Sequence, residues 1–299
     1  MSISIFGFRA LWSPYFFVAL VLLTIAYFIL TTKYRSRFSG SERHTAGQVS
    51  LFVTFMVLLY IIKGSPLDLL GHIMFSAHMV QMAVLYLVMP PLLIISIPNW
   101  IWRKLFTLSA FDRIFSFFTK PLIGLLVFNL LFSFYHIPLL FDFIKTDMWI
   151  HAIYTSVLFV TAIFMWFPLV NQLEEKQTLT GLYKIGYIFG NGILLTPACG
   201  LIIFADNPLY STFSDPSAWS KAMELCVPSS SLAGLNLSGP ELFNGLPLMD
   251  DQQLGGVLMK VIQEVVYGVV LGYIFFAWYR KENNDNKIDP LSGEGYPAK

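Results

Sequence analysis

The stretch Gly71-His72-Ile73-Met74-Phe75-Ser76-Ala77-His78-Met79-Val80-Gln81-Met82 lies at the head of a long apolar run. It places two histidines, three methionines and a glutamine where the first turns of a membrane helix are expected. Ionisable side chains inside a membrane segment are costly, so they mark candidate functional sites. Other polar residues that reach the same depth on the same side of the membrane are therefore candidates for the same site.

The composition is that of a protein that crosses the lipid bilayer several times. Of the 299 residues, 56% are hydrophobic and only 12% are charged, whereas about a quarter of the residues of an ordinary soluble domain are charged. The formal net charge is +1, and because nucleic-acid binding needs a basic face, no nucleic-acid partner is expected. The two cysteines, Cys199 and Cys226, are too few for a disulfide framework or a structural zinc site.

Seven apolar runs approach the roughly 20 residues that a transmembrane helix needs. The third run contains Pro90 and Pro91, which predict a kink, and the sixth contains Pro197, which predicts a break. The predicted fold is therefore an all-α integral membrane protein, a bundle of seven transmembrane helices. The predicted spans are about 14–32, 49–62, 72–97, 122–137, 149–170, 181–205 and 254–279.

The basic residues are distributed unequally between the connecting segments. Segments 33–46, 98–120, 171–184 and 280–299 hold 14 of the 19 Lys and Arg residues, and the remainder of the chain holds 5. Because basic residues accumulate in cytoplasmic segments, the N-terminus is predicted outside and the C-terminus in the cytoplasm.

Residues 1–280 form one predicted membrane domain, which includes a long outer loop at 206–253. This loop has few large apolar residues to bury, so a separate soluble domain is not expected there. The polar residues 281–299 are predicted to form a disordered cytoplasmic tail.

The predicted topology brings four of the five histidines to the outer side of the membrane, from the third, fourth and fifth spans. Imidazole and thioether groups together suit copper, and thioethers favour Cu(I) in particular. Carboxylates and amides at this level are expected to orient the ligands through hydrogen bonds. The predicted metal ligands are His72, His78, His136, His151, Met74, Met79 and Met82, and the predicted supporting residues are Gln81, Asp250, Asp251 and Gln252.

Spacing limits how these ligands combine on a continuous helix. His72 and His78 are six residues apart, so they point in well-separated directions around the helix axis. His78 is therefore expected to pair with His136 or His151 on another helix, with His72 nearer the surface. A pair of histidines ligating haem is an alternative that spacing does not exclude.

Structural interpretations of the same residues remain open. A histidine near the membrane interface often only hydrogen-bonds a neighbouring helix, and a methionine in a helix is more often packing than a ligand. Asp250 and Asp251 are also suited to capping the N-terminus of the seventh helix. Cys226 is a candidate free thiol, and Cys199 is interpreted as a small packing residue.

Several short motifs occur in a characteristic order along the chain. They are His72-x-x-x-x-x-His78-Met79-x-Gln81, Pro90-Pro91, Tyr135-His136-x-Pro138, His151 with Trp166-x-Pro168, and Asp251-Gln252-Gln253-Leu254-Gly255-Gly256. Together they resemble the seven-span CtaG family of cytochrome c oxidase assembly factors of gram-positive bacteria, over nearly the whole chain. The family positions matched are His72, His78, Gln81, His136, His151, Asp251 and Gln252.

The resemblance implies a role in forming active caa-type cytochrome c oxidase in the plasma membrane. The expected partners are the oxidase subunits and the lipid bilayer, copper is the suspected metal, and no enzymatic activity is expected. Common catalytic motifs such as Gly-x-Ser-x-Gly and His-Glu-x-x-His are missing from the sequence. The competing hypotheses are a membrane transporter of copper or another small solute, suggested by the predicted break in the sixth span, and a scaffold whose histidines only tie helices together.

Overall fold

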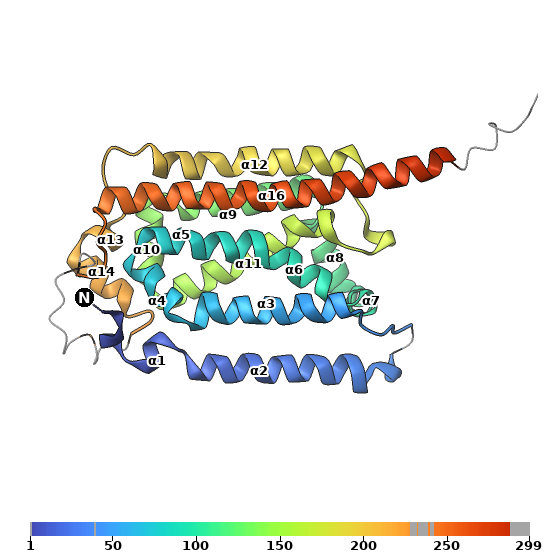
Figure 1. The fold of residues 1–299 in the computed structure, drawn as a ribbon, viewed down its shortest axis with the longest axis horizontal. Helices are drawn as coiled ribbons and strands as arrows, with labels where there is room; N and C mark the ends of the chain where they lie inside the picture. Colours follow the sequence, from blue (N-terminus) through green and yellow to red (C-terminus); the bar gives the residue numbers. More distant parts are fainter. Residues whose placement is uncertain (1, 39, 228–231, 233–238, 240–241, 288–299) are drawn as a thin grey trace, which may run out of the picture.

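The protein is a bundle of α-helices. The computed structural model describes residues 2–38, 40–227, 232, 239 and 242–287, and no strand occurs among them. Within these residues six helices are long and apolar enough to cross a membrane, and a bent pair of shorter helices brings the number to seven if it forms one span. The prediction of an all-α membrane bundle is confirmed (Figure 1).

The spans follow the predicted apolar runs closely, although several differ at their ends. The seventh helix begins before the predicted residue 254 and continues to Lys287, and the rest of the predicted tail, 288–299, lies outside the described residues. The spanning helices are α2 (Pro14–Phe28) with a π-helix (Ile29–Lys33), α3 (Ala46–Gly64), the bent pair α8 (Ser109–Phe118) and α9 (Pro121–Tyr135), α11 (Met148–Val170), α12 (Leu182–Ile203) and α16 (Leu248–Lys287), together with the third span.

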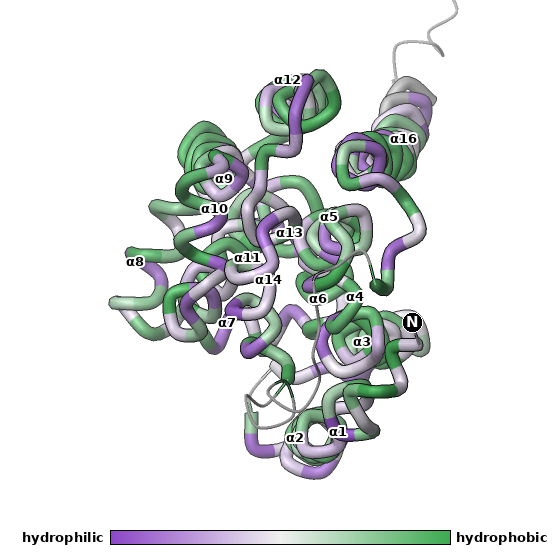
Figure 2. The backbone as a smooth tube through the Cα atoms, turned by 90° about the vertical axis from the view of Figure 1, so that its left-hand side faces the viewer, coloured by the Kyte–Doolittle hydropathy of each residue, from purple (hydrophilic) through white to green (hydrophobic). Residues whose placement is uncertain are grey.

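Short helices mark the two ends of the bundle. One end, here called the α14 end, carries α1 (Phe8–Leu11), α4 (Pro66–Ile73), α10 (Pro138–Lys145), α13 (Ser211–Ser214) and α14 (Pro216–Met223). The opposite end, called the α8 end, carries α7 (Asn99–Phe106) and α8 (Figure 1). Many large hydrophobic side chains of the long helices are exposed, as contact with lipid requires, and much of the chain is coloured as hydrophobic in the end-on view (Figure 2).

The third span lies at the centre of the bundle. It consists of α5 (Phe75–Ala83), a π-helix (Val84–Val88) and α6 (Met89–Ser96). Of its most apolar 18 residues, 61% are buried inside the protein, against 11% for the first span. The π-helix directly precedes Pro90 and Pro91, where a kink is predicted, because prolines cannot donate the hydrogen bonds of a regular helix.

The start of this span corrects the predicted helix 72–97. Met74 has an extended backbone, with φ of −121° and ψ of 131°, so α4 ends at Ile73 and α5 begins at Phe75. His72 and His78 therefore lie on two different helices, and the spacing rule for a continuous helix does not apply to them. The chain breaks here because a carboxylate from α16 bonds the free backbone N–H groups of Phe75 and Ser76.

The predicted break in the sixth span is wrong. Helix α12 continues through Pro197 to Ile203. It packs along α16 and α9, and such packing lets a membrane helix tolerate a proline inside it.

Close packing of α16 against α5 depends on a glycine. A Cβ atom at Gly255 would lie 2.7 Å from Cδ1 of Phe75 and 3.1 Å from Cγ of Met79, both in the core. A Cβ atom at Gly268, farther along α16, would meet no atom within 4 Å. The two glycines therefore separate the effect of packing from that of helix propensity.

We expect Gly255→Ala to lower the midpoint of thermal unfolding in detergent, because an overpacked core contact costs about 1–3 kcal/mol. Gly268→Ala is the matched control, and it should leave the midpoint unchanged or raise it, since alanine favours a helix over glycine by about 1 kcal/mol. Equal midpoints for the two variants would contradict the close contact between α16 and α5.

Candidate metal site

A cavity of about 300 Å³ lies between α3, α4, α5 and α11. Three of the predicted histidines line it, His72 from α4, His78 from α5 and His151 from α11. The ring centres of His72 and His151 are 6.0 Å apart. Gln81 and Met82 also line the cavity, so five of the residues singled out in the sequence surround one space.

Two of these histidines have buried ring nitrogens without a protein partner. Nδ1 of His72 and Nε2 of His78 are buried and accept or donate no hydrogen bond among the described residues. Buried polar atoms are nearly always paired, so unpaired ones call for an explanation such as an ion. Burial lowers the pKa of His72 well below its usual value, with Lys145 adding to the effect, so the imidazole is neutral, the form that binds metals.

A buried lysine contacts His78. Nζ of Lys145, at the end of α10, donates to the backbone carbonyl of Gly71 at 2.8 Å and lies 3.4 Å from Nδ1 of His78. Burial lowers the pKa of Lys145 to about 7. In its neutral form the Lys145 amine accepts the Nδ1–H bond of His78, and this form leaves the Nε2 lone pair of His78 free for an ion.

The predicted supporting residues hold helices in place rather than contacting the histidines. Asp251 accepts hydrogen bonds from the backbone N–H of Phe75 at 2.7 Å and of Ser76 at 3.3 Å, and from the Ser76 hydroxyl. Gln252 accepts one from the backbone N–H of Leu209 at 2.7 Å. Asp250 is exposed to solvent.

Gln81 connects two helices beside the cavity. Its Nε2 donates to the carbonyl of Ile62 at 2.7 Å, at the end of α3, and to Oδ1 of Asp68 at 2.6 Å, in α4. This amide therefore fixes α3, α4 and α5 relative to one another.

Three predicted ligands do not line the cavity. His136 follows the end of α9, where its Nδ1 lies 2.8 Å from the carbonyl oxygen of Phe132 and its ring packs on that residue. Met74 packs against a small apolar cluster at the α14 end, and Met79 is buried in the main core. The sequence predicted the end of the bundle at which these three residues lie, but not the direction in which their side chains point.

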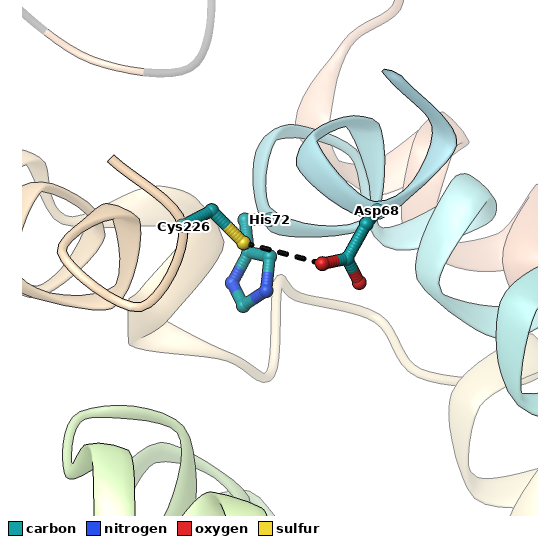
Figure 3. A group of neighbouring side chains, drawn as sticks. All are labelled: Asp68, His72 and Cys226. Atoms are coloured by element: carbon teal, nitrogen blue, oxygen red, sulfur yellow. Dashed lines mark hydrogen bonds between the residues drawn. The ribbon is translucent and has the colours of Figure 1, made fainter. Parts of the chain in front are cut away.

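A group of side chains that the sequence did not predict adjoins His72. The potential ligand atoms of Asp68, His72 and Cys226 all lie within 4.8 Å of one another (Figure 3). The Cys226 thiol donates to Oδ2 of Asp68 at 3.5 Å, and Nζ of Lys63 lies 2.7 Å from Oδ1 of the same carboxylate. Cys226 is far from Asp68 in sequence, and no local pattern indicates that the two meet.

We expect Asp251→Asn to destabilise the protein, because an amide lacks the second acceptor oxygen that the N-terminus of α5 uses, and a buried unsatisfied N–H costs about 1–3 kcal/mol. Asp250→Asn changes the same charge on the exposed neighbouring residue and should leave the thermal midpoint unchanged. A midpoint for Asp251→Asn equal to that of the control would show that the carboxylate does not hold the start of α5.

Comparison with known proteins agrees with the motifs in the sequence. Residues 25–281 match the family described as cytochrome c oxidase caa3 assembly factor, and this range contains every residue of the cavity and of the Asp68 group. No curated protein and no solved structure matches the chain. The apolar spans and this family identify a multi-pass protein of the plasma membrane, and the family implies a non-catalytic role. The chain belongs to the family of cytochrome c oxidase caa3 assembly factors.

Proposed function

We propose that this protein serves the assembly of caa3-type cytochrome c oxidase by holding copper in the histidine-lined cavity and delivering it to an oxidase subunit. The observation that carries the proposal is the cavity itself, where His72, His78 and His151 meet and two buried imidazole nitrogens have no partner among the residues that the structure describes. Family membership supports the oxidase as the recipient.

The lining of the cavity fits Cu(I) better than a hard cation. It offers imidazole nitrogens and the Met82 thioether, and no Asp or Glu is among the described lining residues. Thioether and imidazole suit copper, whereas Mg²⁺ and Ca²⁺ need oxygen ligands. Lys63 lines the cavity, so an ion of low charge is repelled less than a divalent one.

The α14 end is proposed to face the outside of the membrane. Most Lys and Arg residues lie in segments that the fold gathers at the α8 end, and such segments are usually cytoplasmic. Two of the five basic residues outside those segments, Lys63 and Lys145, are partnered beside the site by Asp68 and by the Gly71 carbonyl. His72, His78 and His151 then lie toward the side of the membrane opposite to the cytoplasm.

The transporter hypothesis rested on the predicted break in the sixth span and on polar residues inside the membrane, and it loses the first, since α12 runs unbroken through Pro197. Two amides deeper in the bundle, Asn129 and Asn191, hydrogen-bond to each other at 2.6 Å. This hydrogen bond links α9 to α12, so a structural role explains why these two polar residues lie inside the bundle.

Mutation of a residue that only supports a metal ligand typically lowers metal affinity about 10- to 100-fold, and loss of the ligand itself should cost at least as much. We therefore expect His78→Ala and His151→Ala to weaken Cu(I) binding at least tenfold. The measurement is an anaerobic titration of purified protein against a chromophoric Cu(I) chelator. His136→Ala is the matched control, because His136 lies at the same end and does not line the cavity; it should bind as the wild type does.

A wild-type protein that binds no copper would overturn the proposal, as would equal losses in His136→Ala and His78→Ala. The scaffold hypothesis is tested in cells by the same variants. It requires oxidase activity to fall in step with the abundance of the variant protein, whereas the copper proposal requires oxidase activity to fall in His78→Ala at normal abundance.

A further inference from the structure

We infer that Cys226 and His72 form a Cu(I) site at the α14 end, with Asp68 as the group that receives the thiol proton. This inference deepens and rests on the proposed function, because it names the ligand through which copper enters the histidine cavity. Cys226 lies in the long segment between α12 and α16, which the histidine and methionine pattern does not include.

The position of the thiol is fixed by packing. Trp219 and Met223 of α14 are buried against Leu69 and Ile73 of α4 in a small apolar cluster. The chain turns directly after α14, where the backbone N–H of Cys226 donates to the carbonyl of Met223 at 3.1 Å. Cys226 therefore belongs to a segment that is anchored on the helix carrying Asp68 and His72.

The three side chains are chemically matched to a thiophilic ion. Thiolate and imidazole are both good ligands of Cu(I), and the His72 ring contributes a buried nitrogen that has no partner in the described part of the chain. On binding, the S–H bond of Cys226 breaks and a sulfur–copper bond forms. The proton passes to Oδ2 of Asp68, which already accepts the thiol hydrogen bond at 3.5 Å, and copper remains Cu(I) because no electron is transferred.

His72 joins this site to the cavity. It is 4% exposed, it belongs to the group with Cys226, and it also lines the cavity with His78 and His151. Cys226 is half-buried, whereas His72 is buried. Copper bound by Cys226 and His72 then reaches His78 and His151 by exchanging one ligand at a time, with His72 as the shared ligand, so it is never released from the protein.

The test is X-ray absorption at the copper edge of protein loaded anaerobically with Cu(I), comparing Cys226→Ser with Cys199→Ser, each also made in Met82→Leu protein so that the thioether of the cavity cannot supply the sulfur. Copper in the wild type should be bound by sulfur and nitrogen. In the Met82→Leu protein, Cys226→Ser should lose the sulfur contribution, while Cys199→Ser should keep it, since Cys199 is buried in α12 and does not belong to the Asp68 group. The serine hydroxyl still donates to Asp68, and an unchanged thermal midpoint shows that the variant is folded.

Sulfur bound to copper at the wild-type level in folded Cys226→Ser protein that also carries Met82→Leu would overturn the inference. Copper bound by nitrogen alone in the wild type would also overturn it, while leaving copper in the histidine cavity and the proposed function intact. A wild-type protein that binds no Cu(I) at all would overturn both.

Discussion

The Asp251 carboxylate, placed between α16 and the start of α5, is the interaction on which the site depends. A helix that begins inside a membrane protein leaves backbone N–H groups without acceptors, and water is not available to satisfy them. Asp251 accepts two of these bonds, from Phe75 and Ser76. The chain can therefore stop α4 at Ile73 and start a new helix two residues later.

This interruption determines which side chains meet. A continuous helix would separate His72 from His78 around its axis, whereas the break lets α4 carry Asp68 and His72 while α5 carries His78 and Gln81. The hydrogen bonds of Gln81 to Ile62 and Asp68 then hold α3, α4 and α5 together beside the cavity. The segment that follows α12 completes the arrangement by adding Cys226 to the same group.

The sequence allowed the helical class, the spans and the end of the bundle that carries the histidines to be predicted, because hydropathy and basic residues report membrane position directly. The direction in which each ligand points could not be predicted, because it depends on the extended backbone of a single residue, Met74. That conformation is stabilised by Asp251, more than 170 positions away in the sequence. For the same reason His136 was grouped with His78 although its ring nitrogen bonds the carbonyl of Phe132. Lys145 and Cys226 carried no local signal, because only tertiary packing places a lysine and a thiol beside histidines.

The most direct test of this account is an anomalous difference map, recorded at the copper edge, from crystals of the protein loaded anaerobically with Cu(I). The account predicts a copper peak within bonding distance of a ring nitrogen of His72, the one residue shared by the cavity and the Cys226 group. A peak bound by His136 instead, or a loaded crystal with no peak at His72, would contradict it.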